Sequence, residues 1–176
     1  MTEQNDEENI GKSMGKIMIF VTWAILLGFL TLFFSQILHQ QRNPNQDVQS
    51  MQLSSGIKQV VLQRNRQGHY VATGQINGQA MEFLLDTGAS DIAIPKHLAE
   101  QLGLQALGPI QYQTANGVVT GYRTKLKSVR LGNIELTQVN GGINPGMRNN
   151  QILLGMSFLK HLEFTQRGDT LTLRQY

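Results

Sequence analysis

The chain of 176 residues contains no cysteine, which excludes disulfides, thiolate metal sites and thiol nucleophiles. Its histidines are His39, His69, His97 and His161. They are far apart and lack the i, i+4 spacing with which a helix holds a metal ion. A phosphate-binding glycine pattern is also missing, because Gly141-Gly142 does not precede an expected helix. We therefore predict neither a metal nor another cofactor.

Charge is sparse as well. Charged residues make up 15% of the chain, aromatic residues 7%, and the formal net charge is +3. The Lys and Arg residues are scattered and are not interleaved with aromatic residues, so we predict no nucleic-acid partner. Glycine, by contrast, occurs 18 times, and Val, Ile and Thr are frequent. This composition indicates a turn-rich β protein.

One long hydrophobic run lies near the N-terminus. Ile17–Phe34 is uncharged and almost wholly apolar, and as a helix it would span about 27 Å of a hydrocarbon core roughly 30 Å thick. A buried soluble helix would show a polar face, and a cleaved signal peptide would be shorter and followed by a small-x-small site. We therefore predict an uncleaved transmembrane anchor helix over residues 17–38, after a polar N-terminal tail over residues 1–16.

The flanks of this run suggest an orientation and a domain boundary. Lys12 and Lys16 precede it and only Arg42 and His39 follow closely, which favours a cytoplasmic N-terminus. We expect a single-pass protein of the inner (cytoplasmic) membrane, with its folded domain on the periplasmic or extracytoplasmic side. Residues 39–57 are rich in Gln, Asn and Ser and are predicted to form a flexible linker. The remaining residues, 58–176, suffice for one compact domain.

The domain is expected to consist of short strands separated by turns. Asn77-Gly78 and Asn116-Gly117 are strong hairpin signals. Helices are expected only after Pro95 and over Met156–His161, and an irregular loop over Gly141–Asn150. The expected strands are Lys58–Gln63, His69–Ile76, Gln79–Leu85, Ile92–Ile94, Ile110–Ala115, Val118–Arg123, Thr124–Leu131, Ile134–Val139, Gln151–Leu154, Leu162–Thr165 and Thr170–Arg174. This pattern predicts an all-β fold closed into a barrel.

The stretch Phe83–Asp91, FLLDTGASD, contains the candidate catalytic residue. It places Asp86 at the tip of a strand, followed by a turn in which Gly88 can direct amide N–H groups towards the carboxylate. Alone the pattern is weak, because an ordinary Asx turn after a strand has the same residues. Its meaning depends on what accompanies it.

Two features accompany it. An apolar strand ending in glycine, Ile152–Gly155, follows about 65 residues downstream and precedes a short helix, and a hairpin tipped by Ala115-Asn116-Gly117 lies between. Together these motifs resemble the retropepsin-like aspartic proteases (clan AA), and most of all the bacterial membrane-anchored, single-lobe members. The resemblance covers about residues 58–176. It implies a closed barrel in which the two motifs cross as a ψ-loop under the catalytic carboxylate, with the hairpin as a flap over bound peptide.

The resemblance also implies residue roles. Asp86 matches the catalytic aspartate, Thr87 the threonine that bonds across to the partner subunit, and Gly88 the glycine whose N–H supports the carboxylate. Ser90 and Met156 depart from the retroviral pattern, which has a paired aspartate and arginine there. The C-terminal hairpin also replaces the short tail strand of the retroviral dimer. The implied sets are Thr87, Gly88, Ala89 and Ser90 for the catalytic loop, Leu153, Leu154 and Gly155 for the ψ-loop, and Ala115, Asn116 and Gly117 for the flap.

Aspartic proteolysis needs two carboxylates that share a proton and hold a water between them. A chain with one such aspartate can supply the pair only as a C2 homodimer with two Asp86 side chains on its axis. The leading interpretation is a membrane-anchored aspartic endopeptidase acting on peptide or protein substrates. The alternatives are a non-catalytic module of the same fold, used for dimerisation or peptide binding, and a small β-barrel adaptor with an accidental Asp-Thr-Gly.

Overall fold

The computed structural model describes residues 3–114 and 117–176. The chain divides into two compact units, Met1–Gln40 and Gln41–Tyr176, which are taken in turn. The first unit consists of most of helix α1 (Glu3–Arg42), which begins within the segment predicted to be a polar tail and continues without a break.

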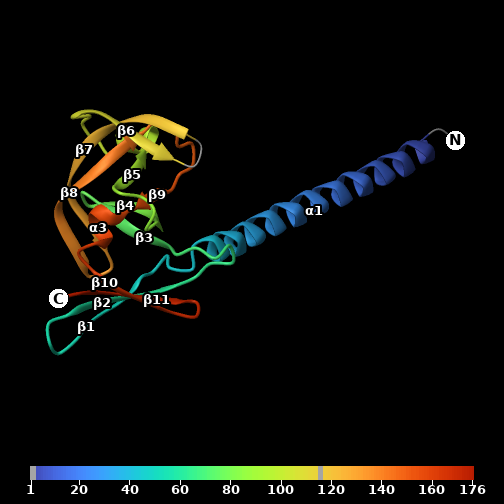
Figure 1. The fold of residues 1–176 in the computed structure, drawn as a ribbon. Helices are drawn as coiled ribbons and strands as arrows, with labels where there is room; N and C mark the ends of the chain where they lie inside the picture. Colours follow the sequence, from blue (N-terminus) through green and yellow to red (C-terminus); the bar gives the residue numbers. More distant parts are fainter. Residues whose placement is uncertain (1–2, 115–116) are drawn as a thin grey trace. The chain divides into compact units, whose positions relative to one another are not determined.

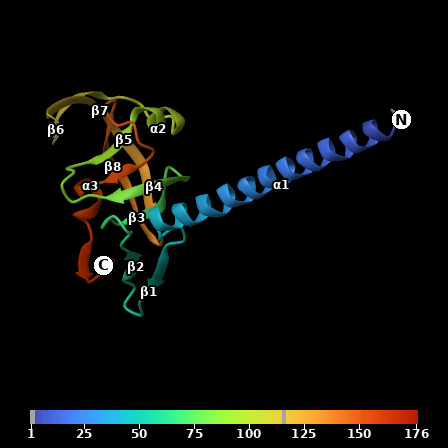
Figure 2. The same cartoon turned by 90° about the vertical axis from the view of Figure 1, so that its right-hand side faces the viewer.

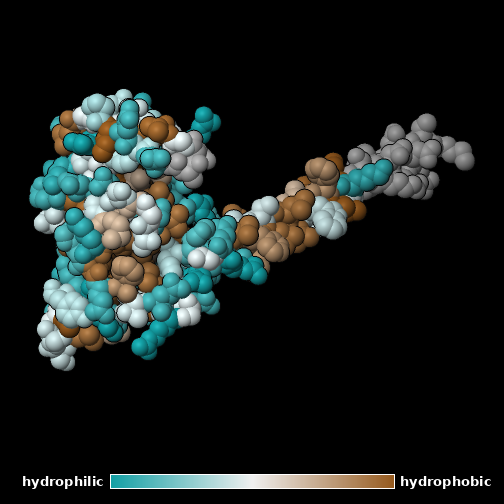
Figure 3. All heavy atoms as spheres, viewed as in Figure 1, coloured by the Kyte–Doolittle hydropathy of each residue, from teal (hydrophilic) through white to brown (hydrophobic). Residues whose placement is uncertain are grey.

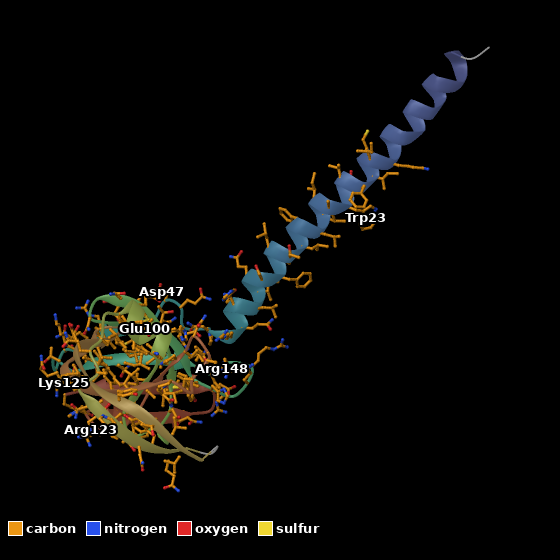
Figure 4. All side chains as sticks on the ribbon, turned by 90° about the horizontal axis from the view of Figure 1, so that it is seen from above. Trp23, Asp47, Glu100, Arg123, Lys125 and Arg148 are labelled. Carbon is orange, nitrogen blue, oxygen red and sulfur yellow. The ribbon has the colours of Figure 1, made fainter. Side chains whose placement is uncertain are left out.

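The segment Gly15–Arg42 of α1 is long and apolar enough to cross a membrane. Its large apolar side chains are exposed, Figure 3 shows hydrophobic residues along the side of the helix in view, and Trp23 projects from the helix in Figure 4. Its hydroxyl groups find partners within the helix: Thr22 donates to the Met18 carbonyl, Thr31 to that of Gly28 and Ser35 to that of Leu32, each at 2.8 Å. Such internal bonding suits a helix surrounded by hydrocarbon.

The second unit begins with two buried asparagines, each 4% exposed. The Asn45 side chain donates to the carbonyls of Gln63 (2.9 Å) and Val71 (2.7 Å) and accepts from the Gln63 N–H (2.7 Å). Asn43 donates to the Thr73 hydroxyl at 3.1 Å and accepts from the Asn45 N–H at 3.0 Å. The chain is therefore fixed to the domain directly after α1.

Residues 46–57 continue this attachment. Strand β1 (Gln49–Gln52) pairs with β2 (Lys58–Gln63), and the Asn133 side chain donates to the Met51 carbonyl at 2.9 Å. The segment predicted to be a flexible linker thus contains a strand and two buried polar anchors. The compact unit starts at Gln41, not near residue 58, because the hydrogen bonds of the two asparagines, the pairing of β1 and the packing of Val48 on the core attach this segment to the domain.

The body of the domain is a closed barrel. Its seven-stranded sheet has the order β3-β4-β9-β5-β8-β7-β6, and a further pairing of β3 with β7 closes it. The predicted all-β barrel is confirmed. The strands are β3 (Val71–Ile76), β4 (Gln79–Leu85), β5 (Ile92–Pro95), β6 (Gly108–Thr114), β7 (Gly117–Leu131), β8 (Ile134–Asn144) and β9 (Ile152–Leu154).

A second sheet of four strands has the order β1-β2-β11-β10, with β10 (Glu163–Arg167) and β11 (Thr170–Gln175) forming the expected C-terminal hairpin. Two short helices, α2 (Lys96–Gln101) and α3 (Met156–Leu159), complete the fold. The β6–β7 hairpin and the four-stranded sheet lie at opposite ends of the domain, with α3 between them (Figure 1, Figure 2).

Most boundaries of the domain differ from the predictions by only one or two residues, and two differences are larger. β7 is one strand of 15 residues, not two shorter ones, and its first half pairs with β6 while its second half pairs with β8 and touches β3. β8 continues to Asn144, into the segment predicted to be an irregular loop, because Gly141–Asn144 pairs in parallel with β5. Long-range pairing imposes both features on sequences with weak local signals.

The core fills the barrel and continues between the two sheets. Large side chains that are fully buried come from both sheets and from α3, and they include Leu62, Phe83, Ile92, Ile94, Leu126, Leu131, Ile134, Ile152, Leu154 and Phe158. Phe83 comes two residues before the end of β4 and is held by this packing. The residue after the strand therefore projects from a rigid element.

Candidate active site

Asp86 follows directly after β4 at the start of a tight turn. Its Oδ1 accepts a hydrogen bond of 2.8 Å from the Gly88 N–H, and its main-chain carbonyl accepts one of 3.3 Å from Ala89. The Asp86 N–H donates in turn to the Leu154 carbonyl at 3.2 Å. The carboxylate is thus oriented by its own loop and tied to the neighbouring strand, while its side chain remains half-buried.

The strand that supports this loop is β9. It runs parallel to β4, with Leu85 opposite Leu154, and antiparallel to β5, with Ala93 opposite Leu153. The loop from β4 to β5 therefore crosses over β9. This is the ψ-shaped crossing that the resemblance implies, and it brings Asp86 and Gly155 together from positions far apart in the sequence.

Beyond β9 the two motifs are joined through their backbones. The Met156 N–H donates to the Ala89 carbonyl at 2.8 Å, and the Ser157 N–H donates to the Ser90 carbonyl at 2.9 Å. Gly155 is required at this crossing, because a Cβ there would come within 2.6 Å of the Ala89 carbonyl oxygen. Main-chain bonds thus join the loop to the first two residues of α3.

Ser157 is a supporting residue that sequence reasoning missed. Its hydroxyl donates to the Asn140 carbonyl at 2.8 Å and accepts from the Ile92 N–H at 3.1 Å. It therefore connects α3, β8 and β5 behind the catalytic loop. Its place two residues after Gly155 was a signal, because a hydroxyl at the start of a helix commonly bonds to nearby backbone.

Two hollows meet at Asp86. One, of about 420 Å³, lies on the side of the C-terminal hairpin and is lined by Tyr70, Leu85, Asp86, Thr87, Leu159, Phe164, Gln166, Leu171 and Leu173. The other, of about 530 Å³, lies between the catalytic loop and β6 and is lined by Asp86, Gly88, Ala89, Ser90, Asp91, Ala93, Ile110, Gln111, Tyr112, Gln113, Asn144 and Leu153. The carboxylate is therefore reachable from two sides.

Tyr112 forms part of the second hollow and is a further residue that the sequence did not reveal. Its ring lies against Gly121 and Gly142, where any Cβ would collide with it. Its hydroxyl is buried, and no group within residues 3–114 and 117–176 bonds to it. Burial raises the pKa of Tyr112, the Asp91 carboxylate raises it further, and Arg123 of β7 (labelled in Figure 4) opposes them.

The other predicted positions fall as follows. Thr87 and Ser90 are exposed on the loop, and Leu153 lines the second hollow. The hairpin predicted to be the flap is formed by β6 and β7, with Thr114 opposite Gly117, whereas Ala115 and Asn116 lie outside the described residues. His97 pairs with the Asn150 side chain at 2.9 Å. Among the described residues, no group of three or more His, Asp or Glu could hold a metal ion.

Known proteins share this architecture and sequence. The family described as "gag-polyprotein putative aspartyl protease" matches residues 72–161. An uncharacterized protein in the cobV 5′ region of a Sinorhizobium species is 36% identical over 125 residues, which cover 69% of this chain and 54% of that protein. An uncharacterized protein of Rickettsia prowazekii (strain Madrid E) is 33% identical over 134 residues, covering 73% and 56%. The chain spans about half the length of these two relatives.

A solved structure agrees with the sequence matches. The crystal structure of a retropepsin-like aspartic protease from Rickettsia conorii matches with a TM-score of 0.58 and 31% identity, over 73% of this chain and 96% of that one. Family, fold and the ψ-crossing under Asp86 therefore agree. The chain belongs to the family of retropepsin-like aspartic proteases.

Proposed function

We propose that the protein is an aspartic endopeptidase that works as a homodimer and is anchored in a membrane by α1. The observation that carries the proposal is the setting of Asp86: a carboxylate at the tip of β4, oriented by the Gly88 N–H at 2.8 Å and held over β9. A purely structural Asx turn would not need a carboxylate that borders two hollows.

In the proposed mechanism, two Asp86 carboxylates face each other across a twofold axis with one proton between them. Like charges about 3 Å apart cannot both ionise cheaply, so one carboxylate is the base and the other the acid at the same pH. The base takes a proton from the bound water as the water oxygen attacks the peptide carbonyl, and the acid protonates the carbonyl oxygen. As the tetrahedral intermediate collapses, the former acid takes back a proton from a hydroxyl of the intermediate. The C–N bond breaks and the amine leaves with the proton that the base had taken from the water, so the carboxylates again share one proton.

The hollow between the catalytic loop and β6 is the proposed substrate site. Its lining combines apolar side chains such as Ile110 with the two acids Asp86 and Asp91. β6 is the last strand of its sheet, so an extended peptide could add to it by main-chain hydrogen bonds. The β6–β7 hairpin would then serve as the flap, with Gly117 at its tip.

The anchor supports this proposal in a second way. α1 would hold the protein as a single-pass component of the inner membrane, with the domain on the periplasmic or extracytoplasmic side. Two copies in one membrane meet at a higher effective concentration than free molecules do. A weak interface would then be sufficient for an active dimer.

Cleavage of a peptide library by the full-length chain in detergent, between about pH 3 and 7, tests the proposal. Asp86→Asn keeps the size of the side chain and removes its ionisation, so cleavage should disappear. Asp47→Asn makes the same change at an exposed site, labelled in Figure 4, and should cleave like the parent. If the parent bound peptides but cut none of them, the protein would be a binding module of the same fold.

A further inference from the structure

The sheet face that borders the proposed substrate hollow continues beyond it along β7. Tyr112 lines that hollow, and its ring lies against Gly121 of β7. Because alternate residues of a strand point to the same face, this face continues through Arg123, Lys125 and Lys127, all of which are exposed. Arg123 and Lys125 lie at the surface of the domain in Figure 4. A row of three cations therefore leads away from the hollow.

A series of hollows leads in the same direction. The substrate hollow shares Gly88–Asp91 with a second hollow of about 340 Å³, which Asn140, Ser157 and Lys160 also line. The same three residues line a third hollow of about 160 Å³, between β8 and the C-terminal end of α3, together with His161. Neighbouring hollows thus have walls in common from the catalytic loop to the end of α3.

One asparagine joins the row of cations to these hollows. Asn140 of β8 lies opposite Lys125, and its side-chain oxygen accepts a hydrogen bond of 2.9 Å from the Lys125 ammonium group. Its main-chain carbonyl accepts from the Ser157 hydroxyl at 2.8 Å. The Lys125 ammonium group therefore lies beside the second and third hollows. We call the combined surface the basic face, and its members are Arg123, Lys125, Lys127, Lys160 and His161.

The charge of the basic face is not neutralised by the domain. All five side chains belong to exposed residues, and none forms an ion pair within residues 3–114 and 117–176. Asp91 lines the second hollow together with Lys160, and Glu163, two residues after His161, pairs with Arg174. Uncompensated charge of one sign attracts ligands of the opposite sign. The cations that do form ion pairs are Arg42, Arg64, Lys96, Arg130 and Arg174.

The position of the basic face favours a peptide as its anionic ligand. Six residues of β7 separate Gly121 from Lys127, a distance of about 20 Å in an extended strand. An extended peptide that leaves the hollow would cover this distance with about six residues of its own. Acidic side chains at alternate positions of the peptide would have the same spacing as Arg123, Lys125 and Lys127.

We propose that the basic face binds an acidic segment of the peptide substrate, next to the part that enters the hollow. The inference rests on the proposed function, because it takes the bound peptide to be the substrate. Each exposed ion pair contributes little alone, but several in a row raise the affinity and the rate of association, and salt weakens both. The protein should therefore prefer substrates with clustered Asp and Glu within about six residues of the hollow.

Peptide binding without cleavage tests the basic face. The full-length Asp86→Asn variant in non-ionic detergent is titrated into a rhodamine-labelled peptide of about eight residues in which Glu and Ala alternate. A second peptide carries Gln in place of Glu. Fluorescence anisotropy at about 20 mM salt should show at least about tenfold tighter binding of the Glu peptide, and the difference should shrink at about 300 mM salt.

Matched double variants locate the binding. Lys125→Gln with Lys127→Gln, in the Asp86→Asn background, should weaken binding of the Glu peptide about fivefold or more and leave that of the Gln peptide unchanged. Lys96→Gln with Arg148→Gln removes the same charge at exposed positions outside the basic face, of which Arg148 is labelled in Figure 4, and should bind both peptides as Asp86→Asn does. Thermal melts establish that both variants are folded.

The outcomes separate the basic face from the proposed function. Equal binding of the Glu and Gln peptides, or an equal loss in the two double variants, would overturn the basic face whether or not the parent cleaves peptides. Tighter binding of a single-stranded DNA of the same charge, or of anionic lipid vesicles, that depends on Lys125 and Lys127 would also overturn it. A parent that cleaves no peptide, while Asp86→Asn still selects the Glu peptide through Lys125 and Lys127, would refute only the function.

Discussion

Replacing Gly155 by alanine should disrupt both the fold and the catalytic loop. The new Cβ would lie 2.6 Å from the Ala89 carbonyl oxygen and closer still to the Asp91 carbonyl, and both are backbone atoms that cannot rotate away. Overpacking costs about 1–3 kcal/mol. Separating the strands also weakens the bonds from Met156 to Ala89 and from Ser157 to Ser90, each contributing about 1 kcal/mol. We expect a total loss of about 3–5 kcal/mol.

A loss of this size is a large part of the stability of a small domain, so Tm should fall by roughly 10–20 °C. Circular dichroism melts of the full-length chain in detergent measure it. Gly146→Ala is the matched control, because the nearest atom to its Cβ is the Asn144 side-chain oxygen at 3.2 Å, which can move. A Gly155→Ala protein that melts with the parent and cleaves as fast would refute the view that this crossing positions Asp86.

Two further perturbations follow from the contacts of single side chains. Asn45→Ala removes three hydrogen bonds to the backbone of β2 and β3 and should lower the free energy of unfolding, measured in urea, by about 2–4 kcal/mol. Gln46→Ala, at an exposed neighbouring position, should lower it little. An unchanged urea midpoint for Asn45→Ala would show that the attachment is not part of the domain. Burial raises the pKa of Tyr112 in the folded state, so the folded protein holds the phenol proton more tightly than the unfolded chain does. This difference stabilises the fold below about pH 10, and the stabilisation is lost as the pH rises through the pKa of the folded state. Stability measured across the alkaline range should therefore fall more steeply for the parent than for Tyr112→Phe, and parallel curves would contradict the proposed burial.

The catalytic loop and its partner strand could be predicted from sequence because each has a local signal. Asp86-Thr87-Gly88 follows an apolar strand, and Gly155 follows another and precedes α3. A glycine is often found where two backbones approach so closely that no side chain fits, and Gly155 marks the crossing of the two motifs in this way. The barrel likewise followed from the regular alternation of short strands and turns.

The attachment of residues 43–52 could not be predicted, because composition does not distinguish a flexible asparagine from a buried one. Asn43 and Asn45 lie in a stretch of Gln, Asn and Ser that is typical of linkers. Their amides nevertheless satisfy main-chain groups of β2 and β3 almost as another strand would, and Asn45 also pairs with Ala72 as an isolated bridge. Only the positions of those distant strands make the two side chains structural.

Tyr112 shows the same limit at the site itself. Its ring fits only because Gly121 of β7 and Gly142 of β8 leave space for it, and those positions become neighbours through pairing across the sheet. No local pattern links the three residues. The sequence therefore indicates where the candidate carboxylate lies, because a strand and a turn suffice to position it. The walls of the proposed substrate site are built from contacts between strands, and they form only when the barrel closes.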